Sequence, residues 1–267
     1  MKAAQRKRKK RIDGIESPTG EWHTKEESVA AVVGDYFSDV FTSANPSDSS
    51  INEVLECVEK SVTTEMNSVL LSAFTEDDIR HALFEMGSNK APGPDGFHAA
   101  FYQHNWDLVG KGVTRMCLNV LNGDHPIEAL NATLLCLIPK TKEPRQVSEY
   151  RPISLCNVAY KLITKTIVNG LKLVLGNIIS ENQSAFVPGH LISDNALVAF
   201  ELMHALRAKL NGSKGWLALK LDMSKAYDRV ELSFLEAIMV RLGFADQWIK
   251  LTWKCITTAS FSCLING

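Results

Sequence analysis

The chain has 267 residues, of which 45% are apolar and 22% charged, and its formal net charge is −1. This composition is ordinary for a globular chain with a sizeable core, and the length suits one large domain or two small ones. The sequence contains no apolar run of about 18 residues and no apolar stretch behind its basic N-terminus, which excludes a transmembrane helix and a secretory signal.

Positive charge is concentrated at the N-terminus, whereas the rest of the chain is mildly acidic. The basic residues there are Lys2 and the unbroken run Arg6, Lys7, Arg8, Lys9, Lys10 and Arg11. A basic head on an acidic body is typical of an arm that binds nucleic acid or directs nuclear import. A solvated, disordered tail explains the same run equally well, so the residues alone leave both interpretations open.

The N-terminal third is expected to be mainly helical. Residues 1–25 have the composition of a flexible arm, and residues 26–41 place valine and phenylalanine at helical spacing. Residues 43–50 (SANPSDSS) have linker composition. Further on, Thr75 followed by Asp78 predicts a capping box at the start of another helix.

The strongest loop signal is GSNKAPGPDG at residues 87–96. Its prolines and glycines are incompatible with a helix interior or a central strand. A helix is expected next, over about residues 107–121, and then a strand over residues 132–138, which Pro139 closes. The remaining predicted elements are helices over 157–175, 194–210, 232–242 and 245–259, and strands over 216–222 and 261–265. Ser193 is the predicted N-cap of the second of these helices, and Gly243 ends the third.

The cysteines are spaced as free thiols rather than as metal ligands. They stand at positions 57, 117, 136, 156, 255 and 263. No pair has the CxxC spacing, so a zinc site is not expected, and mostly buried thiols point to a reducing compartment. An intracellular location, nuclear or cytoplasmic, is the corresponding expectation.

Asp222 stands at the C-terminal end of the apolar stretch WLALKLD, which predicts a buried strand. A carboxylate at the mouth of a strand can hold a divalent cation against phosphate oxygens. Capping of the next turn is the alternative, because aspartate is common in turns. The segment 224–226 offers backbone N–H groups as an anion nest, and Asp228 either assists Asp222 or caps the next helix.

Several cations and one glutamine also lie in segments that could contact nucleotides. Lys140 follows the predicted strand, and Arg151 is held extended by the proline after it. Arginine suits bidentate phosphate binding and lysine acts as a point charge. Lys90 in the 87–96 loop and Gln183 in QSAFVPG could contact a nucleic acid, with Phe186 packing on bases. Plain surface cations, a rigid connector and a core phenylalanine remain the alternatives.

Taken together and in this order, five segments resemble the reverse transcriptase of non-LTR (LINE-type) retrotransposons of the kind abundant in plants. They are NKAPGPDGF at 89–97, LIPK at 137–140, YRPISL at 150–155, QSAFVPGH at 183–190 and LDMSKAYDRV at 221–230. The likeness covers the chain from about residue 75 onward. It implies an α+β right-hand polymerase fold, with helix-rich fingers followed by the first strand and helix of a palm.

The resemblance also assigns roles to residues. Asp222 matches a catalytic, Mg²⁺-binding aspartate, and the carbonyl of Met223 would be an adjacent metal ligand. Tyr227 matches the aromatic gate under the nucleotide sugar, and Lys225 and Ala226 would offer N–H groups to the triphosphate. Lys140 and Arg151 match the family's triphosphate-binding cations in the fingers. Lys90 and Gln183 lie in segments that line the template path in the family. The partners implied are an RNA template, a DNA primer and a dNTP.

The resemblance divides the chain into four segments. These are a basic arm at 1–25, a helical leader with its linker at 26–74, a fingers-like region at 75–215 and an incomplete palm at 216–267. The family's Asp-Asp motif and its thumb find no counterpart in the sequence. The expectation is therefore a partial polymerase domain that is inactive alone.

Two alternatives stay open beside the partial polymerase. One is a remnant that binds nucleic acid without turnover, and the other is a fragment whose exposed sheet edge favours aggregation. No oligomeric state is predicted.

Overall fold

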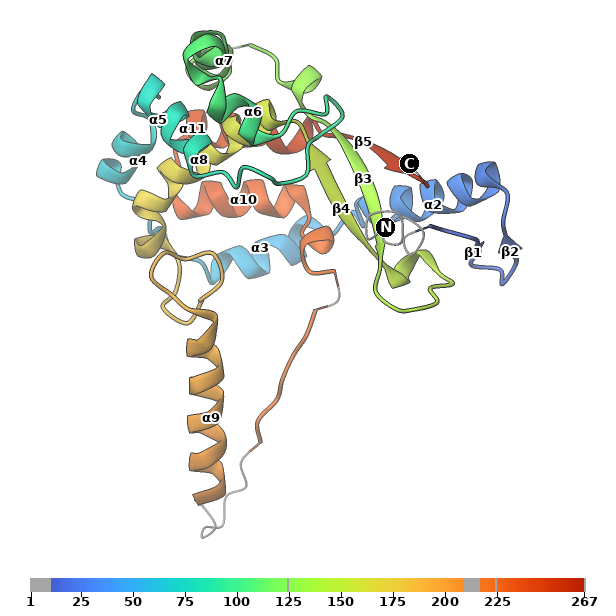
Figure 1. Cartoon of the computed structure of the whole chain (residues 1–267). Helices are drawn as coiled ribbons and strands as arrows, with labels where there is room; N and C mark the ends of the chain where they lie inside the picture. The colour runs from blue at the N-terminus through green and yellow to red at the C-terminus, as the bar shows by residue number, and fades with distance from the viewer. Residues whose placement is uncertain (1–10, 124, 209–216, 224, 267) are drawn as a thin grey trace. The chain divides into compact units, whose positions relative to one another are not determined.

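The computed structural model describes residues 11–123, 125–208, 217–223 and 225–266. Helices and strands both contribute, so the predicted α+β class is confirmed (Figure 1). The chain divides into two compact units. The first unit comprises Met1–Ser47, Ser72–Ile167 and Asp246–Gly267, and the second comprises Asp48–Leu71 and Val168–Ala245.

The first unit contains a three-stranded sheet with the order β4-β3-β5. Strand β3 (Ala132–Pro139) pairs antiparallel with β4 (Tyr150–Cys156) and parallel with β5 (Ser260–Leu264). The strands predicted at 132–138 and 261–265 are therefore confirmed as β3 and β5. Along β3, residues alternate between buried and half-buried positions, so one face of the sheet packs on the core and the other is more open.

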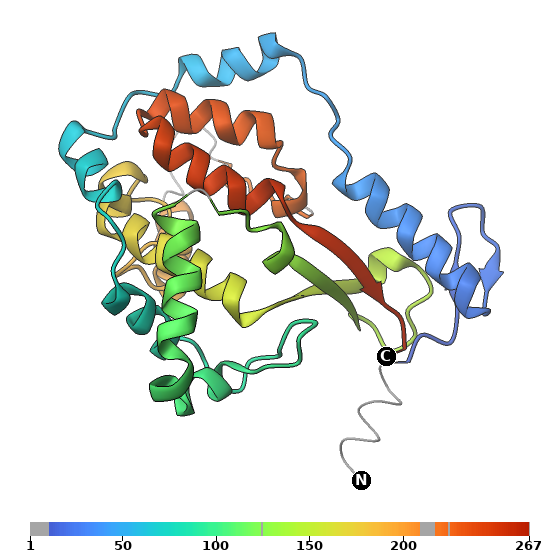
Figure 2. The ribbon, with the colours of Figure 1, turned by 90° about the horizontal axis from the view of Figure 1, so that it is seen from above.

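The core of this unit forms between the buried sheet face and the N-terminal segment. Helix α2 (Glu26–Phe41) has the predicted bounds and buries Val29, Val33 and Phe37. The short strands β1 (Ile15–Glu16) and β2 (Trp22–His23) pair beside it (Figure 2). Residues shared by this core are Ile12, Ile15, Val29, Val33, Phe37, Leu135, Leu137, Val147 and Tyr150.

The predicted disordered arm at 1–25 is wrong for its second half. Residues 1–10 lie outside the described part of the chain, but Ile12 and Ile15 are buried in the core. The side chain of Asn266 also bonds to both backbone groups of Ile12, accepting from its N–H at 2.8 Å and donating to its carbonyl at 3.1 Å. The signal that was missed is the pair of isoleucines inside a polar stretch. They are enough to order this segment because their side chains pack on a face of the sheet.

A helical layer in the same unit consists of α5 (Glu76–Phe84), α6 (Ala99–His104) and α7 (Trp106–Leu121). The capping box predicted from Thr75 and Asp78 is present at the start of α5. Residues 87–96 contain no helix or strand, as their prolines and glycines predicted. The layer is joined to the sheet through 3-10 turn η1 (Glu128–Leu130).

Helix α8 (Val158–Ile178) and helix α11 (Asp246–Thr257) meet the sheet at the buried residue Asn131. The Asn131 amide donates to the carbonyl oxygen of Cys255 at 2.9 Å and to the hydroxyl of Thr258 at 3.0 Å. The hydroxyl of Tyr160 donates to the same Cys255 carbonyl at 2.9 Å. One buried amide therefore ties the start of β3 to the end of α11.

The second unit contains helices α3 (Asp48–Glu56), α4 (Thr64–Leu70) and α10 (Leu232–Leu242). Because α3 begins at Asp48, the linker predicted at 43–50 is shorter than expected. Helix α10 ends as predicted at Gly243, whose φ of +95° is the left-handed conformation that glycine adopts freely. The Leu242 carbonyl accepts from the N–H groups of Ser61 and Val62, which fixes this end against the segment before α4.

Helix α9 (Ile192–Ala208) also belongs to the second unit. It begins at Ile192, so Ser193 lies in the first turn, and the predicted N-cap is wrong. The carboxylate of Asp194 instead accepts the N–H of Leu191 at 2.8 Å. A serine one residue inside the helix cannot be told from a cap by composition alone.

The buried strand predicted at 216–222 is not observed. Trp216 lies outside the described residues, and residues 217–223 have no regular structure. Leu217, Leu219 and Leu221 are 88%, 73% and 83% exposed. The alternation of the sequence does favour a strand, but a strand needs a hydrogen-bonded neighbour, and the described part of the chain supplies none for this segment.

In the same described part, no helix is long and apolar enough to cross a membrane.

Candidate functional site

Lys140 and Arg151 share one face of the hairpin formed by β3 and β4. Arg151 pairs with Ile138 in the antiparallel register, and the N–H of Lys140 donates to the Glu149 carbonyl at 2.8 Å, continuing the ladder. Because strand side chains alternate, Lys140 lies on the same face as Ile138 and Arg151. Diagonal neighbours of this kind have backbones about 7–8 Å apart. The two cations can therefore contact one polyanionic group.

Both cations are exposed, and Lys140 is already oriented by the hairpin. Its Nζ donates to the Ser148 carbonyl at 2.7 Å, which leaves two of its three N–H donors for a ligand. Arg151 forms no ion pair among the residues that the structure describes. Its planar fork is thus available for bidentate binding.

The turn that carries Lys140 is held by Glu149, the last residue of 3-10 turn η2 (Val147–Glu149). The Glu149 carboxylate accepts the N–H groups of Arg145 at 2.6 Å and Gln146 at 3.1 Å. These bonds, the first from Arg145, lower the pKa of Glu149 because they favour the charged carboxylate. The turn is consequently most ordered when Glu149 is ionised.

Lys90 is presented by a loop fixed to the junction between β4 and α8. Gly93 is buried there, and a Cβ on it would lie 2.3 Å from the Asn157 backbone nitrogen. The Asn157 side chain accepts the N–H of Asp95 at 3.2 Å, and Lys161 Nζ donates to the Ala91 carbonyl at 2.9 Å. The loop is therefore a packed element, and Lys90 on it is exposed.

Asp222 and Met223 are the last two residues of the segment 217–223, and both are exposed. A carboxylate and a backbone carbonyl are the hard oxygen donors that Mg²⁺ takes. No group of three acidic, histidine or cysteine side chains that could hold a metal occurs among the residues described. The donors at Asp222 and Met223 thus fit Mg²⁺ in kind but do not complete a metal site.

Tyr227 lies beside Phe186, a contact between two predicted segments that the sequence did not indicate. Their ring centroids are 6.3 Å apart in an edge-to-face arrangement, and each side chain is 78% exposed. Tyr227 begins the 3-10 turn η3 (Tyr227–Arg229). Phe186 and Lys225 have φ values of +65° and +54°, a left-handed conformation that is uncommon outside glycine.

Gln183 precedes this aromatic pair and is exposed. Its carbonyl oxygen lies 2.8 Å from Nδ1 of His190, which closes the loop between them. The Gln183 side chain is left on the surface, where it can contact a polar ligand.

The predicted site residues fall into two groups. The first unit contains Arg11, Lys90, Lys140 and Arg151, and the second contains Gln183, Asp222, Met223, Lys225, Ala226 and Tyr227. Arg6, Lys7, Arg8, Lys9 and Lys10 lie outside the described residues. Sequence reasoning missed Asn157 and Lys161, although an asparagine directly before a helix is a recognisable signal for a capping or loop-binding residue.

Comparison with known proteins gives one family and two curated relatives. Residues 138–264 match the family model "Reverse transcriptase (RNA-dependent DNA polymerase)". The chain is 33% identical over 198 residues to the "Transposon TX1 uncharacterized 149 kDa protein" of Xenopus laevis, covering 74% of this chain and 15% of that protein. It is 26% identical over 227 residues to the "Retrovirus-related Pol polyprotein from type-2 retrotransposable element R2DM" of Drosophila melanogaster, covering 82% and 19%.

Proposed function

The chain contains part of a reverse transcriptase domain of the non-LTR retrotransposon type, and from that premise we propose that it contributes the nucleotide-binding side of RNA-templated DNA synthesis. It spans less than a fifth of the length of either relative, so the activity of a whole protein is part of the proposal. Residues 75–215 would belong to the fingers and residues 216–267 to part of the palm.

The shared open face of Lys140 and Arg151 is the observation that carries this proposal. Arginine binds two phosphate oxygens through parallel N–H bonds, and lysine adds a mobile point charge. The incoming dNTP carries three linked phosphates, which match two cations at diagonal positions on one hairpin. The pre-formed bond from Lys140 to Ser148 reduces the entropy lost when a triphosphate binds.

Asp222 and the carbonyl of Met223 are proposed as Mg²⁺ ligands. In phosphoryl transfer, bound Mg²⁺ neutralises phosphate charge and activates the attacking hydroxyl. Because no group of three candidate metal ligands occurs among the described residues, Asp222 would contribute one ligand and not a working centre.

The aromatic pair supports a role for Tyr227 at the sugar. An aromatic ring under the nucleotide sugar disfavours a 2′-hydroxyl by contact, and Phe186 would support that ring from its edge. The N–H groups of Lys225 and Ala226 would bind the triphosphate, and Lys90 and Gln183 would contact the template strand. The nucleic-acid partners are thus an RNA template and a DNA primer.

Primer extension by the purified chain tests the proposal. With Mg²⁺, dNTPs and a DNA primer on an RNA template, the chain should bind the duplex but should not extend the primer. Extension that disappears in Asp222→Ala would overturn the view that the site is incomplete. Absence of dNTP binding at low salt would overturn the nucleotide-binding role itself.

A second candidate function is nucleic-acid binding without turnover. The basic run that ends at Arg11 favours it, because clustered lysine and arginine release counterions from a phosphate backbone. Neutralising Arg6 to Arg11 would then weaken binding and flatten its salt dependence. The free thiols support a further proposal, an intracellular reducing compartment, nuclear or cytoplasmic.

A further inference from the structure

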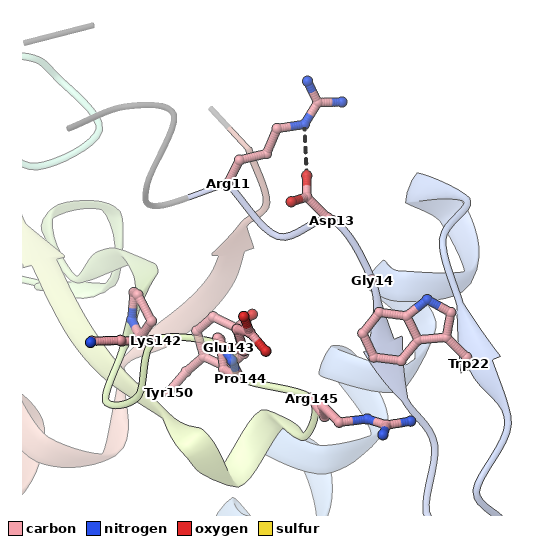
Figure 3. A pocket seen from close by; sticks show the side chains of 10 residues that line it. Arg11, Asp13, Gly14, Trp22, Lys142, Glu143, Pro144, Arg145 and Tyr150 are labelled. Atoms are coloured by element: carbon pink, nitrogen blue, oxygen red, sulfur yellow. Dashed lines mark ion pairs between the residues drawn. The ribbon is translucent and has the colours of Figure 1, made fainter. Parts of the chain in front are cut away.

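The first unit contains a cavity of about 580 Å³ that the proposed function does not use. It lies between the N-terminal segment and the turn of the β3–β4 hairpin (Figure 3). The residues that matter for its chemistry are Arg11, Trp22, Lys142, Glu143, Arg145 and Tyr150. A volume of this size is typical of pockets that hold a small organic ligand.

The aromatic wall of this pocket is fixed in place. Trp22 is 45% exposed, and the Arg145 guanidinium carbon lies 5.6 Å from the centre of its ring. Gly14 brings the backbone against the indole: a Cβ there would lie 2.5 Å from two of its carbons. Tyr150 is buried at the base of the hairpin. The guanidinium lies over the indole, and an unpaired base can stack on such an aromatic–arginine pair.

The charges around this ring can bind phosphate. The Arg11 Nε lies 3.6 Å from Asp13 Oδ1 in an exposed pair, and the Arg145 Nε lies 3.1 Å from Oε2 of Glu16, whose side chain is 23% exposed. Exposed pairs such as Arg11–Asp13 contribute little, so a phosphate can compete for Arg11, and the exposed Arg145 guanidinium has further N–H donors to offer. Lys142 is exposed and has no ion pair among the described residues.

The pocket is separate from the proposed triphosphate cations. Pro139 and Tyr150 pair in the hairpin register and both line the pocket. The neighbouring pair, Ile138 and Arg151, projects from the opposite face because strand side chains alternate. A ligand in the pocket would therefore contact one side of the hairpin while a triphosphate contacts the other.

We propose that this pocket binds an unpaired nucleotide of a single-stranded nucleic acid, with the base stacked on Trp22 and the adjacent phosphates on Lys142, Arg145 and Arg11. Arg11 is also the last residue of the basic run, so this pocket cation is continuous in sequence with further positive charge. That continuity favours a strand over a free mononucleotide. The inference does not rest on the polymerase assignment, because it uses no residue of the proposed nucleotide site.

Binding of a fluorescein-labelled oligouridylate by the full chain, followed by fluorescence anisotropy, tests the proposal. Stacking of one base implies that Trp22→Ala weakens binding by about 5- to 150-fold. Trp22→Phe retains a stacking ring and should stay within about threefold of wild type. Lys142→Glu should weaken binding and lower the salt slope by about one unit. Lys172→Glu is the matched control on exposed helix α8 surface and should change binding little.

The outcomes separate the alternatives. Equal binding by wild type, Trp22→Ala and Lys142→Glu would overturn the proposal, as would an acidic peptide that competes as well as the oligonucleotide. Full competition by uridine monophosphate at equal concentration would overturn the preference for a strand. Thermal melts of each variant identify misfolding, and Lys142→Glu keeps the test valid if Trp22→Ala unfolds. Binding of a dNTP that depends on Lys140 and Arg151 is scored separately, so either idea can fail alone.

Discussion

Replacing Gly93 by alanine is expected to be the most damaging one-carbon change in the loop at residues 87–96. A Cβ at this position would lie 2.3 Å from the Asn157 backbone nitrogen, 2.4 Å from its Oδ1 and 2.4 Å from the Cys156 carbonyl carbon. Two of the three nearest atoms are backbone and cannot rotate away. The loop itself must therefore move.

The cost follows from what that movement breaks. Displacing the loop loses the bond from Asp95 N–H to Asn157 and the bond from Lys161 to the Ala91 carbonyl. Each hydrogen bond contributes about 1 kcal/mol, and the strain of overpacking adds about 1 kcal/mol more. Gly93→Ala should thus lower the free energy of unfolding by about 2–3 kcal/mol.

Urea unfolding and hydrogen exchange measure the two parts of this prediction. The matched control is Gly112→Ala in α7, where a Cβ meets nothing within 4 Å and alanine favours the helix by up to about 1 kcal/mol. Exchange in peptides covering 88–97 should accelerate in Gly93→Ala only. Wild-type stability together with unchanged exchange in Gly93→Ala would refute the packing of this loop.

Three further predictions concern buried or charged groups of the first unit. Asn131→Ala and Tyr160→Phe each remove one of the two side-chain donors to the buried Cys255 carbonyl. The first change should lower the free energy of unfolding by about 2 kcal/mol and the second by about 1 kcal/mol. A double-mutant cycle should show a coupling of about 1 kcal/mol, because the double variant leaves that carbonyl without either donor. Hydrogen bonds from Arg145 and Gln146 lower the pKa of Glu149, which stabilises the fold above the ordinary glutamate pKa. Glu149→Gln should therefore be less stable than wild type at pH 7 in thermal melts, and the difference should vanish as pH falls through the folded pKa. Burial raises the pKa of Cys117 to about 12, so its thiol should not react with iodoacetamide at about pH 8 until the protein unfolds, whereas exposed Cys57 should be labelled. Peptide mass spectrometry measures both labels, and labelling of Cys117 in the folded protein would contradict its burial.

Local patterns predicted most regular elements because their signals lie within a few residues. The bounds of α2 follow from apolar spacing alone, and the end of α10 follows from a glycine that adopts φ > 0. The strand β3 was likewise visible as an apolar run ended by Pro139. Such features need no knowledge of distant partners.

The parts that failed depend on residues far apart in the sequence. The segment 217–223 has a strand pattern, yet only a paired neighbour would turn that pattern into a strand. The burial of Ile12 depends on a sheet face more than a hundred residues away in sequence, which no local pattern encodes. Gly93 against Asn157 and Phe186 beside Tyr227 are long-range contacts of the same kind.

Titration of a fluorescent dNTP analogue with the whole chain, in the presence of Mg²⁺, tests the central claim most directly. We predict salt-dependent binding that the double change Lys140→Ala and Arg151→Ala weakens by at least about tenfold, since two contacts to the triphosphate are lost. The single change Lys172→Ala should leave binding within about twofold of wild type. No binding at low salt, or equal binding by the double variant and wild type, would contradict the assignment of the hairpin face to nucleotide binding.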